Sequence, residues 1–374
     1  LVHELVSATG ANRPGAEGFN GAVNYLAGKL GDGATQATAH TARLFLGLQV
    51  QCTQCHNHPF NDWKQSQFWQ FNSFFRQAVA LRRFRPGTRE LRFVELANQD
   101  FAGEDRPSEP GQARVYYELR NGRLEAAFPV FVDGTEIGKS GYLQENNRRD
   151  ELARLISSSE YLPRAIVNRL WAHFLGYGFT RPIDDMGPHN PPVSPELLEY
   201  LAEQLQQSQY DLRQVIEWMM LSEPYRLSSR FHRGNEADDP ARGRPPRFSR
   251  FYLRQMSPEQ LYASLHTASG ANEGQGDPQQ QEQARRQWLR QFTIALGTDE
   301  GDETTTFNGT ITQTLMMFNG ELTKQATDLK ENRFLASVVS DTRLRPVEKI
   351  QEMFQAALSR QPTRREQRTA QKLL

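Results

Sequence analysis

Apolar residues recur with helical spacing over most of this chain. Such a period predicts helices wherever apolar side chains return every three to four positions. In the N-terminal part the spacing covers 34–47 and the aromatic-rich segment 63–75. In the C-terminal part it predicts helices at 149–158, 163–175, 195–207 and 212–222, another from 258, and three within 311–374.

One stretch has a different period. Between 114 and 137 apolar residues alternate with polar ones, and Asn121-Gly122 is a strong pair for a hairpin turn. We therefore expect a small β hairpin whose second strand runs over 124–132, with Pro129 placing that strand at a sheet edge. The segment 82–111, rich in Arg, Pro, Gly and acidic residues, is predicted to be a linker or exposed loop. The segment 233–250, which has few apolar residues, is predicted to be disordered or exposed.

Together these elements predict a mainly α-helical, loop-rich protein of two domains with a small β hairpin or sheet insertion. A chain of 374 residues is long enough for two or three domains. We expect a helical domain over 1–90, a linker and small β unit over 91–146, and a second helical domain over 147–374.

Charge and composition narrow the classes of function. The chain has 44 basic and 44 acidic residues, and this zero net charge argues against a nucleic-acid binder. No apolar run approaches the roughly 18–20 residues of a membrane helix, so no transmembrane segment is expected. The chain begins at Leu1 without a signal-peptide pattern, which indicates a mature or fragmentary N-terminus.

Both cysteines of the chain fall in one motif, Cys52-Thr53-Gln54-Cys55-His56. This is the attachment pattern of c-type haem, in which two thiols add to the haem vinyl groups and the histidine binds the iron. Ordinary composition gives roughly 0.002 chance matches in a chain of this length, so the motif is specific. We therefore expect covalent haem c, with Cys52 and Cys55 as attachment residues and His56 as iron ligand.

Two other interpretations use the same residues. Cys52, Cys55, His56 and His58 are donors for zinc or iron, although a structural zinc site usually takes its ligand pairs from two separate segments. Alternatively, the two cysteines form a local disulfide or a redox dithiol. His58 follows His56 too closely to reach the opposite face of the same haem, so a sixth ligand would come from elsewhere.

A second candidate site lies in the loop 176–193, which is dense in glycine and proline. Neighbouring carboxylates have separated pKa values and suit acid–base chemistry, which makes Asp184, Asp185 and His189 candidate catalytic residues. Such acids also commonly hold loops or cap helices. No hydrolase or nucleotide-binding motif accompanies them, so whether the chain is an enzyme stays open.

These motifs resemble a known pair of families. The segment 46–60, with Trp63 and Phe74-Phe75 after it, is similar to the DUF1549 family, a planctomycete cytochrome c-like domain. Residues 1–80 resemble only the C-terminal half of that domain. Its usual companion, the DUF1553 or PSD1 domain, is resembled by the stretches 147–153, 167–174, 184–192, 225–229, 257–261 and 317–320.

The resemblance implies an exported protein of the periplasm or cell surface, with no firmly attached activity. Together with the motif it suggests an electron-transfer or redox role with a redox partner protein. The alternative is a non-haem zinc or iron protein with a structural or hydrolase-associated role. Two positions depart from the family pattern. Asn61 stands where aspartate is frequent, and Ser194 stands where histidine is common, so that Ser194 fits a helix cap better than a metal ligand.

Overall fold

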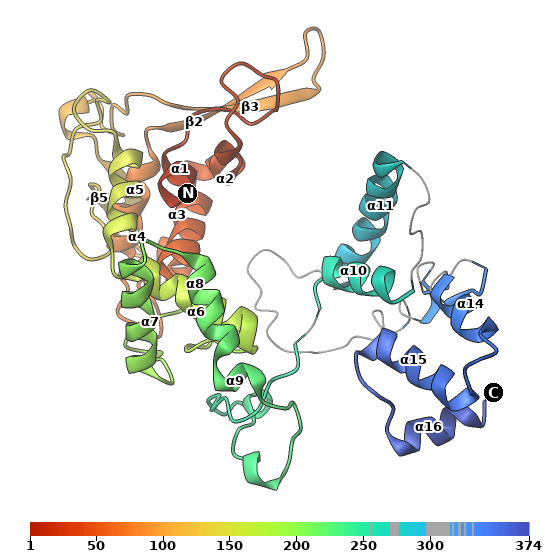
Figure 1. The fold of residues 1–374 in the computed structure, drawn as a ribbon. Coiled ribbons are helices and arrows are strands. Elements are labelled where there is room, and N and C mark those ends of the chain that lie inside the picture. Colours follow the sequence, from red (N-terminus) through yellow and green to blue (C-terminus); the bar gives the residue numbers. More distant parts are fainter. Residues whose placement is uncertain are drawn as a thin grey trace. The chain divides into compact units, whose positions relative to one another are not determined.

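The computed structural model describes residues 1–254, 256–269, 277–296, 315, 318–320, 323–324, 327–330 and 333–373. Two compact units divide the chain, Leu1–Tyr252 and Leu253–Leu374 (Figure 1). The prediction of a mainly helical protein with a small β insertion is confirmed, since the described residues are largely helical and the sheets are short and antiparallel.

The first unit contains most of the regular structure. Its helices are α1 (Val2–Ser7), α2 (Asn24–Ala27), α3 (Gly31–Thr41), α4 (Gln65–Asn72), α5 (Arg148–Ser158), α6 (Tyr161–Leu175), α7 (Pro195–Gln207), α8 (Leu212–Leu221) and α9 (Glu223–Arg226). Short turns of tighter or wider helix are η1 (Gly21–Val23), η2 (Ala42–Leu46), η3 (Gln51–Gln54), η4 (Ser73–Phe75), η5 (Pro110–Gln112), η6 (Arg233–Asn235) and η7 (Pro240–Arg242).

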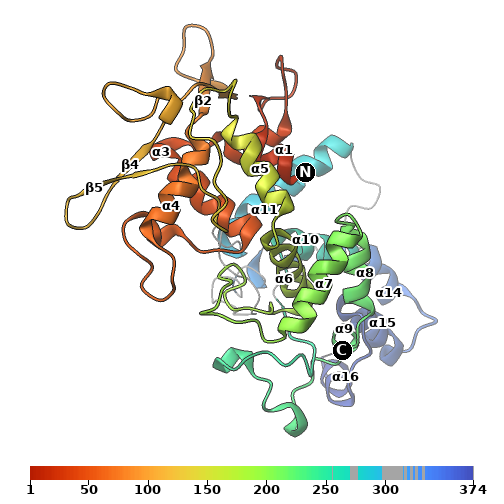
Figure 2. The same ribbon diagram turned by 90° about the vertical axis from the view of Figure 1, so that its left-hand side faces the viewer.

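Five strands make two small sheets in this unit. They are β1 (Gly10–Ala11), β2 (Ala78–Phe84), β3 (Leu91–Asn98), β4 (Val115–Glu118) and β5 (Leu124–Ala127). The first sheet has the order β1-β3-β2, and β4 pairs with β5 alone. In Figure 2 the β4–β5 hairpin and the β2–β3 ribbon both extend from the helices of the first unit.

The exposed loop predicted for 82–111 is wrong over its first half, because β2 and β3 pair with each other there from Ala78 opposite Asn98 to Phe84 opposite Leu91. The charged residues that suggested a loop instead face one another across the ribbon. Arg83, for example, donates to Glu95 at 2.6 Å. A ribbon that is solvated on much of its surface shows little alternation of apolar and polar residues, so the strand period could not be recognised in the sequence. The boundary expected near residue 90 falls in the turn between these strands.

The hairpin predicted within 114–137 is confirmed, with Gly122 in the turn at a φ of +79°. Its second strand is shorter than expected. It ends at Ala127, and Pro129 follows without a backbone N–H to donate to a ladder. The remaining residues of the expected strand add a single bridge, between Val130 and Glu136.

The four helices predicted after 147 correspond to α5–α8, and their ends agree with the prediction to within two residues. Ser194 occupies the N-cap position of α7, as expected, and Pro195 follows at the first helical position. The Ser194 side chain nevertheless makes no capping hydrogen bond. The cap therefore relies on backbone geometry and on the proline.

Two consecutive arginines at the start of α5 connect distant segments of the first unit. Arg148 and Arg149 are both fully buried. Within the residues that the structure describes, neither guanidinium pairs with a carboxylate, and burial lowers the pKa of each to about 10. Their backbone acceptors are the carbonyls of Ser73, Ala113, Lys139 and Ser140 for Arg148 and of Val6, Ser7 and Ala8 for Arg149.

The regular structure in the described part of the second unit is helical, with α10 (Pro258–Ser269), α11 (Pro278–Leu296), α14 (Arg333–Ser340), α15 (Pro346–Leu358) and α16 (Arg364–Gln371). Ser257 caps α10, since its Oγ accepts from the Gln260 amide at 3.2 Å. Val338 and Ile350 are buried in this unit. None of the described helices combines the length and the apolar character that crossing a bilayer requires.

Candidate cofactor-attachment site and its neighbouring pocket

The motif at 52–56 begins in the short helical turn η3 and presents both thiols to solvent. Cys52 and Cys55 are exposed and free, rather than joined in the local disulfide that one interpretation of the sequence proposed. Thr53 between them is buried, and its hydroxyl donates to the Val50 carbonyl at 2.5 Å. The turn is thus fixed from the protein side while its two sulfur atoms remain accessible.

The ring of His56 is oriented by its own loop. Its Nδ1 lies 2.7 Å from the Asn57 carbonyl oxygen. A carbonyl oxygen only accepts, so Nδ1 must carry the proton and the neutral ring keeps its lone pair on Nε2. A histidine that binds a metal through one ring nitrogen usually donates a hydrogen bond from the N–H of the other, often to a backbone carbonyl, and this bond orients the ring.

His58 points to a different neighbour. Its Nδ1 accepts from the Phe60 amide at 3.2 Å, and its ring centroid lies 6.5 Å from that of His189. Among the described residues, no group of three or more His, Cys, Asp or Glu side chains is arranged to hold a metal ion. The four donors of the zinc or iron interpretation therefore do not converge in this arrangement.

Side chains of helix α4 hold the motif in place and also contact the β4–β5 hairpin. The Trp69 indole donates to the Gln54 carbonyl at 3.1 Å and stacks on Tyr117, with ring centroids 6.0 Å apart. The Gln65 amide donates to the carbonyls of Gln54 and Glu118 at 3.3 and 2.9 Å. These contacts place Trp69 beside Cys55 in the lining of a shallow recess of about 340 Å³.

Asp184 is buried and held by two side chains from the segment that precedes the motif. It is 2% exposed, and its carboxylate pairs with the Arg43 guanidinium through Oδ2 and accepts from Gln49 Nε2 at 2.7 Å through Oδ1. Two residues later, the Met186 amide donates to the Gly47 carbonyl at 2.8 Å. The loop 176–193 is thereby attached to the chain just before Cys52.

Asp185 and His189 do meet, as a pair. His189 Nε2 lies 2.9 Å from Asp185 Oδ1, and the two side chains are about one-fifth exposed. Asn190 Nδ2 donates to the Asp185 carbonyl at 2.8 Å and steadies the turn. Of the three acid–base candidates, the structure brings these two together and places Asp184 elsewhere.

A pocket of about 520 Å³ opens beside His189. Part of its lining comes from the residues that follow the motif, among them Asn61, Asp62 and Trp63, and another part from α6 and α7. Sequence reasoning did not single out this pocket. The sequence analysis named Asn61, Trp63 and His189 separately, but their convergence on one pocket is visible only in the fold.

Comparison with known proteins places two family models on this chain. Residues 3–80 match PSCyt2, described as a protein of unknown function (DUF1549), and residues 148–306 match PSD1, described as a protein of unknown function (DUF1553). No curated protein and no solved structure matches the chain.

The pocket therefore lies between the PSCyt2-matching and PSD1-matching segments. Asn61 and Trp63 come from the first, and the α6, α7 and His189 side comes from the second. The Asp184 pair with Arg43 also crosses between the two segments. Their association is thus part of the geometry of the candidate site.

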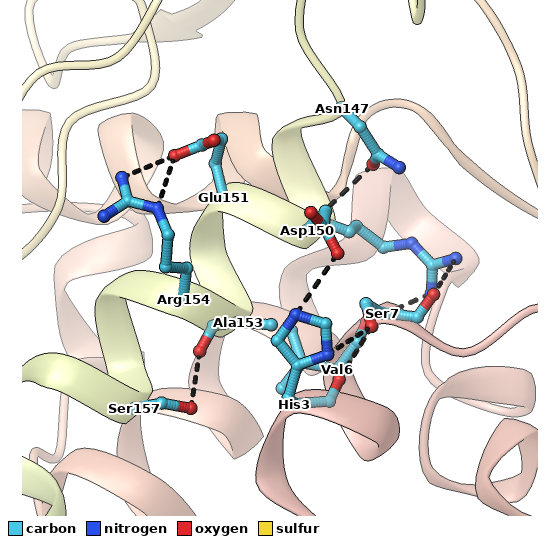
Figure 3. Close-up of polar contacts among 10 residues, drawn as sticks. His3, Val6, Ser7, Asn147, Asp150, Glu151, Ala153, Arg154 and Ser157 are labelled. Atoms are coloured by element: carbon cyan, nitrogen blue, oxygen red, sulfur yellow. Dashed lines mark hydrogen bonds and ion pairs between the residues drawn. The ribbon is translucent and has the colours of Figure 1, made fainter.

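A second arrangement between these segments has the residue types of a hydrolase triad (Figure 3). His3 Nδ1 lies 3.3 Å from Ser7 Oγ, and His3 Nε2 lies 3.2 Å from Asp150 Oδ1. However, the Ser7 hydroxyl donates to the His3 carbonyl at 2.8 Å, and the His3 and Asp150 side chains are about half exposed. The Ser7 hydroxyl proton is used in this backbone hydrogen bond, and its prospective base, His3, is solvated. Ser7 therefore lacks the activation that a nucleophile needs. The contact serves to join α1 to α5.

Proposed function

We propose that the chain is a c-type haem protein of an exported, periplasmic or cell-surface assembly, with a role in electron transfer. In this proposal Cys52 and Cys55 form the two thioether bonds and His56 binds the iron through Nε2. The observation that supports it best is the 2.7 Å hydrogen bond from His56 Nδ1 to the Asn57 carbonyl, made beside two free, exposed thiols.

The donor arrangement fits haem better than a compact metal site. Zinc needs its ligand atoms at about 2.0–2.3 Å from one point. Covalent haem makes no such demand, because the thiols bond to the edge of the macrocycle and only the imidazole reaches the metal. The side chains of 52–56 do not gather around one point in the described structure, and this arrangement is compatible with haem attachment.

When bound, the haem would supply one-electron redox chemistry. The chain's own residues hold and orient the attachment turn. Thr53 fixes the turn from within, Trp69 and Gln65 hold the Gln54 carbonyl, and Asn57 orients His56. Exposed thiols also suit attachment by a separate enzyme, and that chemistry takes place on the export side of the membrane.

The test is expression of the chain as an exported protein in a host with haem-attachment machinery. We expect intact mass to increase by one haem and the reduced spectrum to show the sharp α-band of a c-type haem. His58→Ala is the matched control and should retain both signals, whereas Cys52→Ala together with Cys55→Ala should lose the added mass. A colourless protein of unmodified mass contradicts the proposal, and elemental analysis for zinc and iron then tests the non-haem alternative.

A further inference from the structure

The 520 Å³ pocket beside His189 has the size of a small-molecule site, which commonly spans roughly 300–1,000 Å³. It lies next to the haem motif but contains neither cysteine nor His56 in its lining. Its occupant is therefore a separate question from haem attachment.

The charges of the lining disfavour an anion. Asp62, Glu160 and Glu199 supply three carboxylates, and Arg164 supplies one guanidinium. Arg164 is already engaged, since its Nε lies 2.8 Å from Glu199 and its Nη2 lies 3.3 Å from Glu160. A phosphate, sulfate or carboxylate ligand would meet a net negative lining with its one cation already paired.

Aromatic rings and hydrogen-bonding groups both line the same pocket. Trp63 and Tyr161 are half-buried and line it. Burial and the neighbouring Glu160 raise the pKa of Tyr161, which keeps its hydroxyl protonated and able to donate. Gln67, whose Oε1 accepts from the Lys64 amide at 2.8 Å, adds amide N–H donors.

One polar atom at the pocket lacks a partner. Asn61 Oδ1 accepts from the Trp63 amide at 3.0 Å, whereas Asn61 Nδ2 is buried without a hydrogen-bond partner in the part of the chain that the structure describes. A buried donor left unpaired costs free energy, so such a group indicates an acceptor supplied by a ligand.

We propose that this pocket binds a neutral sugar ring. Such a ligand offers C–H faces to Trp63 and Tyr161 and pairs of hydroxyl groups to the mixed donors and carboxylates around them. An organic cation would use the rings and Asp62 but would leave Asn61 and Gln67 without acceptors. The proposal goes beyond haem attachment and does not rest on it.

The test is saturation-transfer-difference NMR on the full chain with glucose, galactose, mannose and N-acetylglucosamine at low millimolar concentration. We expect transfer to at least one of these sugars. Asn61→Asp keeps the acceptor for the Trp63 amide and puts a carboxylate oxygen in place of the unpaired donor, so it should weaken binding at least tenfold. Tyr200→Ala removes an exposed tyrosine of α7 that does not line the pocket, and it should bind as the unchanged protein does.

Two further arms keep the proposal separate from the haem proposal. A protein with Cys52→Ser and Cys55→Ser cannot hold haem covalently, and its sugar binding should be unchanged. Choline and inorganic phosphate serve as cationic and anionic probes of the same pocket. Absence of transfer to all four sugars, undiminished transfer in Asn61→Asp, or binding of choline or phosphate in their place overturns the proposal.

Discussion

Gln49 Nε2 donates to Asp184 Oδ1 at 2.7 Å, which joins two residues that lie 135 positions apart in the sequence. The same carboxylate pairs with the partly exposed Arg43, so both of its oxygens are engaged while Asp184 itself is 2% exposed. This contact links the loop of His189 to the residues that lead into Cys52. The haem motif and the neighbouring pocket consequently share one structural support.

Loss of the Asp184 charge should weaken that support. Asp184→Asn leaves the Arg43 guanidinium without its carboxylate, and breaking such a largely buried pair costs about 3 kcal/mol of unfolding free energy. Asp185→Asn, a neighbour that is about one-fifth exposed, is the control and should cost less than about 1 kcal/mol. Urea unfolding of the two variants measures the difference, and equal effects would contradict the structural assignment of Asp184.

Gly47 also connects the segment before Cys52 to the loop 176–193, because its carbonyl accepts from the Met186 amide. Its φ is +67°, and a Cβ placed there would lie 2.7 Å from Met186 Sδ. Gly47→Ala combines left-handed strain of about 1 kcal/mol with this overlap, and we expect a total loss of about 2–3 kcal/mol. Gly15→Ala has a similar φ of +79° and nothing within 4 Å of the added carbon, so it reports the strain alone. Thermal unfolding should rank Gly47→Ala clearly below Gly15→Ala; identical losses would show that Met186 adjusts freely.

The sequence was informative where the determinant was local. Helical spacing predicted α5–α8, and Asn121-Gly122 predicted a turn. The 52–56 motif could be recognised from residue type and spacing alone. The sequence was uninformative where the determinant was a distant partner. Asp184 and Asp185 are adjacent in sequence, and only the fold shows that one meets Arg43 and the other His189.

The segment 233–250 shows the same limit. It was predicted to be disordered or exposed because it has few apolar residues, and that prediction is wrong for Asn235, Asp238 and Pro240, which are buried. The fully buried Asp238 organises this segment through hydrogen bonds rather than through apolar packing. Its carboxylate accepts from the amides of Arg247 and Ser249, both at 2.9 Å. A polar centre of this kind leaves no periodic signature in the sequence.

Arg148 provides a test of how the first unit is held together. A lysine there keeps the charge but cannot reach carbonyls on several sides at once, because its ammonium is a single compact donor group. We expect Arg148→Lys to lower the unfolding free energy by about 3 kcal/mol. Arg154→Lys on the same helix is the control, because Arg154 is largely exposed and pairs with Glu151 at the surface. The loss should be below about 0.5 kcal/mol for that variant. Comparable denaturation midpoints for the two would exclude a central role for Arg148.

Asp238 makes the stability of the first unit depend on acid. Burial raises the pKa of this carboxyl, but hydrogen bonds from the Tyr252 hydroxyl and from Arg247 and Ser249 outweigh burial, and the pKa lies below its usual value. The folded state therefore binds the Asp238 proton less strongly than the unfolded state does. The stabilisation is fully present above the unfolded pKa of about 3.9 and is lost as the pH falls through the lower folded value.

Asp238→Asn tests this dependence directly. At neutral pH we expect the variant to be less stable by about 2 kcal/mol, because the amide cannot accept all of these hydrogen bonds through both of its polar atoms. The gap to the unchanged protein should narrow as the pH is lowered from 5 towards about 2, since protonation removes the same interaction from the unchanged protein. Asp239→Asn, whose carboxylate pairs with the exposed Arg242, should leave that pH dependence in place. A gap that stays constant across this range would mean that Asp238 is not the group whose protonation weakens the fold.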